Sequence, residues 1–300
     1  MAPARGSPDA ARVVRTRERC RAAPYAGGPA IGTSLPPVDL RRLAGPFDLI
    51  GDVHGCHQEV LDLLGGLDYR LNPDGQLLPP PGRTAVFLGD LTDRGPDAVG
   101  VLRLVMGMVE AGRALCVLGN HDEKLRRRLE GRRVSTDNGL GETLEQLWAE
   151  PGAFRRRVRL FLDARPAHLL LAGGRLVAAH AGLRADLQGR RTREAWAFAV
   201  YGDTTGERDE FGHPVRRDWA AAYGGAALVV YGHTPVHRAR WMNNTVNIDT
   251  GCAFGGALTA LRYDPHEGGE PELSLRSVRA HRVYWPSPSF AVDLADGEQL

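Results

Sequence analysis

Residues 84–95 have the sequence TAVFLGDLTDRG, in which an apolar run ends abruptly in a glycine followed by polar and charged side chains. The β-branched and aromatic residues of 84–88 predict a buried strand. The glycines at 89 and 95 favour a sharp turn directly after it. Such a turn would present Asp90, Asp93 and Arg94 at the edge of a sheet, where the active sites of open α/β folds gather.

Five other apolar runs end in polar residues in the same way. They are 47–50 before Asp52 and His54, 114–118 before Asn120 and His121, 176–179 before His180, 227–231 before His233, and 245–248 before Asp249. A single cluster of this kind is more commonly a turn or a helix cap. Six such clusters in succession predict that they form one site. Their carboxylate, amide and imidazole groups, without a thiolate, suit ions such as Mn²⁺ or Fe²⁺. The predicted metal ligands are Asp52, His54, Asp90, Asn120, His180 and His233.

The remaining patterns predict the fold class. Apolar residues at helical spacing indicate a helix over 98–111, with similar patterns around 123–129, 140–148 and 154–162. Gly173-Gly174 between 168–171 and 176–179 predicts a hairpin, and 257–263 reads as a last strand. Strands that alternate with helices and later pair as hairpins favour an α/β fold with mixed sheets covered by helices.

Three segments are expected along the chain. Residues 1–46 hold eight arginines against three acidic residues and have no apolar periodicity, so they are predicted to be a disordered tail. A transit peptide shares the arginine-rich composition, but the prolines at 24, 29, 36 and 37 disfavour a long amphipathic helix. Residues 47–285 would form one domain. Pro286 and Pro288 predict that 286–300 is a loose end.

Composition narrows the class of protein. No apolar run approaches the roughly 20 residues that span a bilayer, and the four cysteines have no paired spacing typical of a zinc ribbon or a disulfide framework. We therefore expect a soluble protein of the reducing cytoplasm.

Basic residues are 37 arginines and one lysine, which indicates codon bias. The arginine runs at 126–128, 132–133 and 155–157 are accordingly interpreted as solvated helix faces rather than a nucleic-acid surface. The net charge of −3 over 47–300 also disfavours tight binding of long nucleic acid.

Taken together, the motifs GDVHG (51–55), GDLTDRG (89–95), GNHD (119–122), HAG (180–182) and GHTP (232–235) resemble those of the calcineurin-like metallophosphoesterases, in the phosphoprotein phosphatase branch. The resemblance covers residues 47 to about 263. It implies a metallophosphoesterase β-sandwich of two mixed sheets flanked by helices. It also implies two divalent metal ions, with Mn²⁺ expected first and Fe, Ni, Co or Zn as alternatives. Asp52 and His54 would bind one ion, Asp90 would bridge, and the other ion would be bound by Asn120, His180 and His233.

The same resemblance implies the catalytic roles. His121 would be the general acid for the leaving oxygen, Asp93 would orient it, Arg94 would clamp the phosphate, and Asp249 would lie nearby. These roles agree with the chemistry, because an imidazolium needs a carboxylate partner and a guanidinium fork matches two phosphate oxygens. For a second phosphate-binding arginine the candidates are Arg184, Arg208, Arg216 and Arg217, of which Arg216 is favoured.

Two long stretches, 101–147 and 201–263, are similar to the phosphatase module of bacterial polynucleotide kinase-phosphatase, an RNA repair enzyme. The phrases GLGETLEQL (139–147), YGDTTGE (201–207) and NNTVNID (243–249) carry this similarity. It implies manganese-dependent removal of 2′- and 3′-terminal phosphates and opening of 2′,3′-cyclic phosphates by hydroxide attack. Related stand-alone proteins imply asymmetrical dinucleoside tetraphosphate hydrolysis instead, and the shared metal site leaves a protein Ser/Thr phosphatase open.

The single lysine limits the repair role. Lys124 lies in the sequence HDEKL, which fits neither a P-loop kinase nor the nucleophile of a ligase, so separate proteins would have to supply those steps. The expected binding partner is a phosphorylated nucleic-acid end or a nucleotide, and no association with a membrane is expected. A non-enzymatic scaffold is the remaining alternative, which the complete ligand set disfavours. The sequence leaves the oligomeric state open.

Overall fold

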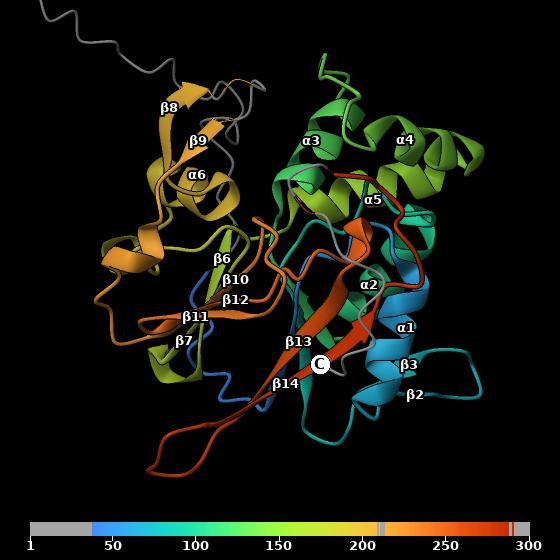
Figure 1. Ribbon diagram of the computed structural model, residues 1–300. Helices are drawn as coiled ribbons and strands as arrows, with labels where there is room; N and C mark the ends of the chain where they lie inside the picture. Colours follow the sequence, from blue (N-terminus) through green and yellow to red (C-terminus); the bar gives the residue numbers. More distant parts are fainter. Residues whose placement is uncertain (1–37, 209, 211–213, 288–289, 291–300) are drawn as a thin grey trace, which may run out of the picture.

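Two five-stranded mixed sheets packed face to face form the centre of the molecule (Figure 1). The computed structural model describes residues 38–208, 210, 214–287 and 290. The first sheet has the order β14-β13-β1-β4-β5, formed by β14 (Glu272–Arg279), β13 (Ala257–Asp264), β1 (Phe47–Ile50), β4 (Thr84–Phe87) and β5 (Ala114–Cys116). The second has the order β11-β12-β10-β7-β6, formed by β11 (Arg240–Met242), β12 (Thr245–Asn247), β10 (Leu228–Tyr231), β7 (Leu176–Ala179) and β6 (His168–Leu171).

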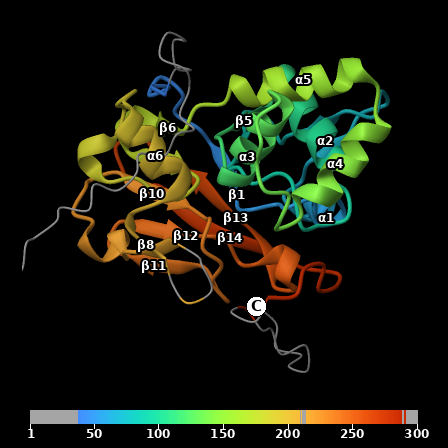
Figure 2. The ribbon, with the colours of Figure 1, turned by 90° about the horizontal axis from the view of Figure 1, so that it is seen from above.

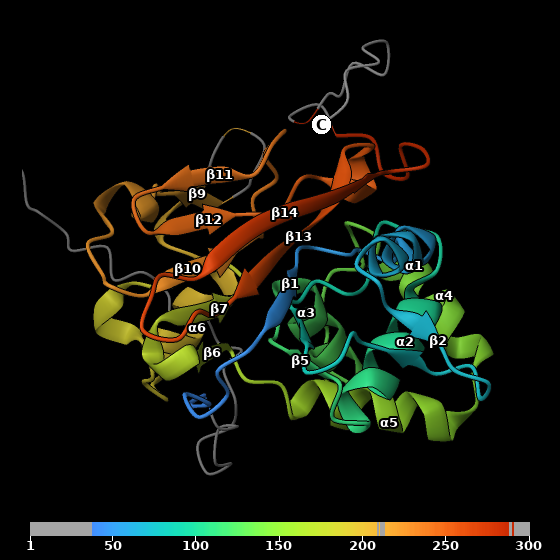
Figure 3. The same ribbon diagram turned by 90° about the horizontal axis from the view of Figure 1, so that it is seen from below.

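Helices cover the outer side of both sheets, as the views in Figures 2 and 3 show. The first sheet is covered by α1 (His57–Gly66), α2 (Ala98–Glu110), α3 (Asn120–Leu129), α4 (Leu140–Ala149) and α5 (Gly152–Asp163). The second is covered by α6 (Arg193–Tyr201) with the 3₁₀ turn Trp219–Ala222. Two small hairpins stand apart, β2 (Arg70–Leu71) with β3 (Leu77–Leu78) and β8 (Thr204–Arg208) with β9 (Pro214–Arg216). Among the described residues, every helix is too short or too polar to cross a membrane.

The central strands β1, β7 and β10 are buried along their whole length, because both faces of each sheet are covered there. In β1, Phe47 and Leu49 pack between the two sheets, whereas Ile50 packs among the helices. In β7, Leu176 belongs to the layer between the sheets and Val177 to the layer under α6. Strands buried on two sides have continuous apolar runs rather than an alternating pattern. The sequence had this feature, and the predicted sandwich of two mixed sheets flanked by helices is confirmed.

Six strands lead into the predicted site. β1, β4 and β5 run parallel to one another in the first sheet, and β7, β10 and β12 do so in the second. All six polar clusters follow the carboxyl ends of these strands. Parallel neighbours end at the same edge of a sheet, so each sheet brings three clusters to one edge.

The predicted tail was wrong for residues 38–46, and 1–37 lie outside the described residues. Val38 is buried, its carbonyl accepts a hydrogen bond from the Leu170 N–H (2.8 Å), and the Leu40 N–H donates to the Leu170 carbonyl (2.9 Å). Leu40 and Leu43 pack against the layer between the sheets. The arginine-rich composition of the whole segment hid these few apolar residues, which extend the second sheet beyond β6.

The sequence analysis also failed to predict three other features, namely β14, the buried Phe290 and α6. Beyond Asp264 the sequence predicted no strand, yet β14 pairs with all of β13. β14 is partly exposed, so its apolar residues are sparse. The predicted loose end at 286–300 is wrong at Phe290, which is buried and stacks on His237 with 4.6 Å between ring centroids; 288–289 and 291–300 lie outside the described residues. α6 is short and was not predicted.

Candidate metal centre and active site

Four of the predicted ligands converge from four strand ends. His180 Nε2 lies 2.9 Å from Asn120 Oδ1 and 3.0 Å from His233 Nδ1. Asn120 Oδ1 lies 2.7 Å from His233 Nδ1. Asp90 Oδ1 is 3.4 Å from His180 Nε2. These atoms are close enough to share one ion.

A second group shares Asp90. Its other oxygen, Oδ2, lies 3.5 Å from His54 Nε2, so the two oxygens of Asp90 face the two groups. Asp52 Oδ2 accepts a hydrogen bond from the His233 N–H (3.1 Å), which places this carboxylate beside the first group. Candidate ligand atoms of His54, Asp90 and His121 lie within 4.8 Å of one another, as do those of Asp90, His180 and His233. The predicted ligands, far apart in the sequence, therefore meet in one place.

The pKa values of the carboxylates and the imidazole at this centre are shifted in the directions that favour binding of a cation. Burial, together with the nearby Asp249 and Asp90 carboxylates, raises the pKa of Asp52 well above its ordinary value. Burial and the Asp122 carboxylate likewise raise the pKa of Asp90. Burial lowers the pKa of His180 to about 3, so this imidazole is neutral, the form that binds a metal. Buried carboxylates beside neutral imidazoles match the ligands of a divalent cation.

Hydrogen bonds orient the imidazoles. His54 Nδ1 donates to the Thr92 carbonyl (2.9 Å), and His180 Nδ1 donates to the Leu88 carbonyl (3.0 Å). Metal-binding histidines are commonly held in this way, which directs the lone pair of the other nitrogen to the ion. Within the described part of the chain, Asp52 Oδ1 is buried with no hydrogen-bond partner, although its other oxygen accepts from the His233 N–H. The donor set and this unsatisfied carboxylate oxygen fit two divalent ions.

The backbone is strained at the centre. His54, Asp90, Asp93, Arg94 and His233 all have positive φ values between 46° and 73°. A non-glycine residue in this region costs about 1–3 kcal/mol, and such residues cluster at functional sites. The turns after the strands place these side chains, and the surrounding structure offsets the cost.

His121 and Asp93 form a buried pair. His121 Nδ1 lies 2.6 Å from Asp93 Oδ2, and His121 Nε2 lies 3.0 Å from Arg94 Nη2. The Arg94 guanidinium also contacts His54 and stacks on the ring of Phe254 at 4.9 Å. Burial raises the pKa of Asp93 to about 7. Burial and the positive charge of Arg94 lower the pKa of His121.

Two positioning residues were missed by sequence reasoning. The buried Thr143 hydroxyl of α4 donates to Asp93 Oδ1 (2.8 Å) and accepts from the Asp93 N–H (3.0 Å). Asp122 accepts hydrogen bonds from the N–H groups of Leu91 (3.0 Å) and Gly119 (3.1 Å), and so ties together the loops after β4 and β5. Asp122 stands inside the GNHD motif and Thr143 inside GLGETLEQL, which were the available signals.

Asp249 and the arginine candidates are now placed. Asp249 is buried next to Asp52, and its carboxylate accepts from the Gly251 N–H (3.1 Å). Arg184 pairs with Asp186 and Glu194, and Arg217 pairs with Asp203. Arg208 and Arg216 both line the cavity that contains Arg94.

That cavity, of about 770 Å³, opens over the metal centre, and its lining residues include members of α3 and of the β8–β9 hairpin. Figure 1 shows these two elements near one another at the same end of the molecule. Among the described residues that line it, six are cationic and Asp90 is the one acidic residue. The six are Arg94, Lys124, Arg127, Arg133, Arg208 and Arg216. Three aromatic residues, Tyr201, Phe254 and Trp285, also line it. The site is therefore shaped for an anionic ligand with aromatic surface nearby.

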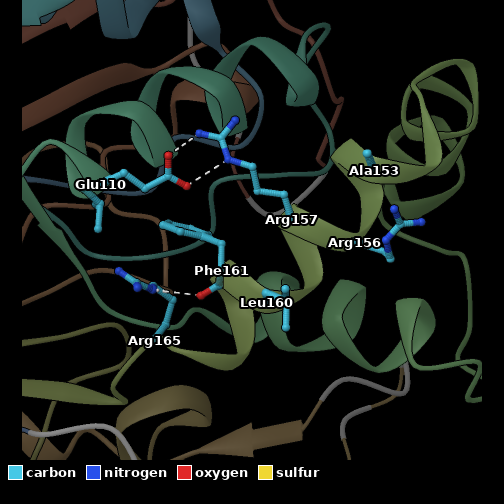
Figure 4. A pocket seen from close by; sticks show the side chains of 8 residues that line it. Glu110, Ala153, Arg156, Arg157, Leu160, Phe161 and Arg165 are labelled. Carbon is cyan, nitrogen blue, oxygen red and sulfur yellow. Dashed lines mark hydrogen bonds and ion pairs between the residues drawn. The ribbon is translucent and has the colours of Figure 1, made fainter.

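Two other arginines of the basic runs bind carboxylates of the protein. Arg126 is buried and binds the carboxylates of Glu123, Glu130 and Asp163. Figure 4 shows a hollow beside α5, where Arg157 pairs with Glu110.

The sequence profile of the calcineurin-like phosphoesterase family matches residues 45–237. The chain is 45% identical over 244 residues to the asymmetrical bis(5′-nucleosyl)-tetraphosphatase PrpE of Geobacillus sp. (strain WCH70), covering 80% of this chain and 96% of that protein. The enzyme of the same name from Bacillus subtilis (strain 168) is 44% identical over 242 residues, covering 79% and 96%. A crystal structure provisionally named as a diadenosine tetraphosphatase superposes with a TM-score of 0.58 and 25% identity, covering 82% of this chain and 99% of that one. The chain belongs to the calcineurin-like phosphoesterase family and is a metal-dependent hydrolase of phosphate esters.

Proposed function

We propose that the protein hydrolyses bis(5′-nucleosyl) tetraphosphates asymmetrically, to a nucleoside triphosphate and a nucleoside monophosphate. The cationic cavity carries this proposal. Within the described residues, Arg127 and Arg133 form no ion pair, in contrast to Arg126, so their charges are available to phosphate. The similar proteins from Geobacillus and Bacillus subtilis are named bis(5′-nucleosyl)-tetraphosphatases, which supports the same substrate class.

α3 connects the metal centre to this cationic wall. Asn120, Lys124 and Arg127 are spaced i, i+4 and i+7, so they lie on one side of the helix. From Asn120 to Arg127 the helix rises about 10 Å. Its positive N-terminal end lies at the metal centre, which further favours an anion there. A chain of phosphates would run from the centre along α3, and the aromatic residues of the cavity would offer stacking surfaces for a base.

In this reaction Asp52, His54 and Asp90 would hold one divalent ion, and Asp90, Asn120, His180 and His233 the other. Such ions neutralise phosphate charge and lower the pKa of water. Mn²⁺ is our proposed ion.

His121 would protonate the leaving oxygen through Nε2. The Asp93 carboxylate fixes the ring through Nδ1 and stabilises its protonated form. Burial and the Arg94 charge lower the His121 pKa; a phosphate bound to Arg94 would offset the second of these causes, so substrate binding favours the acid form. Arg216 would be a second phosphate contact.

The nucleic-acid-end substrate, which the sequence favoured first, takes second place because the curated relatives are named tetraphosphatases. Its RNA repair role and separate kinase and ligase partners have no support beyond the resemblance.

The deciding experiment compares diadenosine tetraphosphate, a 3′-phosphorylated oligonucleotide and a phosphopeptide with the Mn²⁺-loaded enzyme. We expect the highest kcat/KM on the tetraphosphate, with ATP and AMP as products by chromatography. A higher kcat/KM on the oligonucleotide would overturn the proposal.

Variants test the cationic wall. Arg127→Gln and Arg133→Gln should each raise the KM for the tetraphosphate about tenfold, the loss of one charge-assisted contact of about 1.4 kcal/mol. Hydrolysis of p-nitrophenyl phosphate should stay unchanged, because a single phosphate at the metal centre does not reach them. Arg156→Gln, an exposed arginine of α5 outside the cavity, is the matched charge control.

A further inference from the structure

A second group of metal-binding side chains lies outside the catalytic centre. The Sγ atoms of Cys56 and Cys252 and a carboxylate oxygen of Glu59 lie within 4.8 Å of one another. Cys56 and Glu59 are fully buried, and Cys252 is 2% exposed. Cys56 and Cys252 are free thiols, separated by almost two hundred residues and brought together only by the fold.

Glu59 is oriented in the way that a metal ligand would be. Its Oε1 accepts hydrogen bonds from the His281 N–H (3.0 Å) and the Tyr284 hydroxyl (2.7 Å). Its Oε2 is buried and has no partner among the described residues. A buried carboxylate oxygen without a partner is costly. Ligating carboxylates commonly have one oxygen held by the protein in this manner, while the other faces the ion.

We propose that Cys56, Glu59 and Cys252 bind a third divalent cation, Zn²⁺, separate from the catalytic ions. Two sulfur ligands and one carboxylate suit zinc, whereas the catalytic centre has oxygen and nitrogen ligands alone. Around a tetrahedral zinc, ligand atoms lie roughly 3.5–3.8 Å apart, so the observed cluster needs only a small contraction. Two thiol protons leave to solvent on binding, and a solvent molecule takes the fourth position.

The site would join segments that position the catalytic centre. Cys56 follows His54 by two residues, and Cys252 follows Asp249 by three. Glu59 belongs to the first turn of α1, and its partners His281 and Tyr284 follow β14. An ion here would hold these four segments together whatever the phosphate substrate is, so the inference does not depend on the proposed function.

The test uses the full chain with Cys20→Ser in every protein, so that the cysteine outside the described residues does not contribute. Each protein is saturated with Mn²⁺ and then given one equivalent of Zn²⁺. X-ray absorption at the zinc edge should show a sulfur shell at about 2.3 Å. The shell should persist in Cys116→Ser, which removes a buried thiol of β5 outside the cluster, and disappear in Cys252→Ser. Zinc should raise the Tm of the Cys20→Ser parent and of the Cys116→Ser variant, and it should leave the Tm of the Cys252→Ser variant unchanged.

A second variant keeps the test decisive if Cys252→Ser does not fold. Glu59→Gln retains both thiols and the side-chain shape, and we expect its zinc affinity to fall at least tenfold. A zinc spectrum with only nitrogen and oxygen ligands in the parent protein would overturn the proposal. So would unchanged zinc affinity in Glu59→Gln, or peptide mass spectra in which Cys56 and Cys252 form a disulfide and the reduced protein takes up no zinc at this site.

Discussion

Thr143 offers the sharpest test of the proposed acid catalysis, because its hydroxyl forms hydrogen bonds with Asp93 and with no other residue that the structure describes. Thr143→Val keeps the shape of the side chain but removes both hydrogen bonds, to Asp93 Oδ1 and from the Asp93 N–H. The Asp93 N–H is then buried without an acceptor, which costs about 1–3 kcal/mol of folding stability. The carboxylate also loses the contact that sets its angle toward His121.

The catalytic effect follows from the role of the pair. General acid catalysis contributes about 10²–10⁴-fold. Thr143→Val disturbs the orienting carboxylate without removing it, so we expect kcat on diadenosine tetraphosphate to fall about 10- to 100-fold. This corresponds to about 1.4–2.7 kcal/mol in the barrier. KM should change little, since the phosphate contacts remain.

The assay measures kcat and KM with Mn²⁺ on two substrates. On p-nitrophenyl phosphate, whose leaving group needs little protonation, the fall in kcat should be much smaller. Thr143→Ser, which keeps the hydroxyl, should restore most of the rate. Combined with Asp93→Asn, Thr143→Val should add little further loss, because both act through one pair. An equal loss on both substrates, or no rescue by serine, would refute a positioning role.

Three other predictions follow from the fold and the metal centre. Asp48→Asn should lower the free energy of unfolding by about 3 kcal/mol in urea titrations, because the buried carboxylate binds Arg83 (3.0 Å) and Arg262 (3.1 Å); an unchanged urea midpoint would contradict this. Gly89→Ala should destabilise the protein by at least about 2 kcal/mol and reduce metal content, since φ is +89° and a Cβ would lie 2.4 Å from the Gly119 nitrogen; normal metal content in the folded variant would argue against it. Removal of metal with EDTA should abolish hydrolysis and lower the Tm, because the buried carboxylates lose their counter-charge, and Mn²⁺ should restore both; full activity after verified metal removal would exclude the metal centre.

The arginine runs show why charge patterns alone are weak evidence of function. Arg126 and Arg127 are neighbours in the sequence, but one is buried among three carboxylates and the other lines the catalytic cavity. A helix turns by about 100° per residue, so adjacent side chains meet different surroundings. Whether an arginine binds a carboxylate of the protein or faces a substrate depends on the elements packed beside it.

The sequence by itself determined the strands that end in metal-binding residues, since a continuous apolar run followed by glycine and a polar cluster is a local signal. It also determined the family and the helices 98–111 and 140–148. Only the tertiary structure decided which distant side chains touch. Thr143 meets Asp93 because α4 packs on the turn after β4, and Cys56 meets Cys252 because the loops after β1 and β12 are neighbours. Such contacts join residues far apart in the chain, and no local pattern encodes them. Sequence reasoning missed β14 and the buried Val38 for the same reason. Each is stabilised by hydrogen bonds to the strand beside it and not by its own composition.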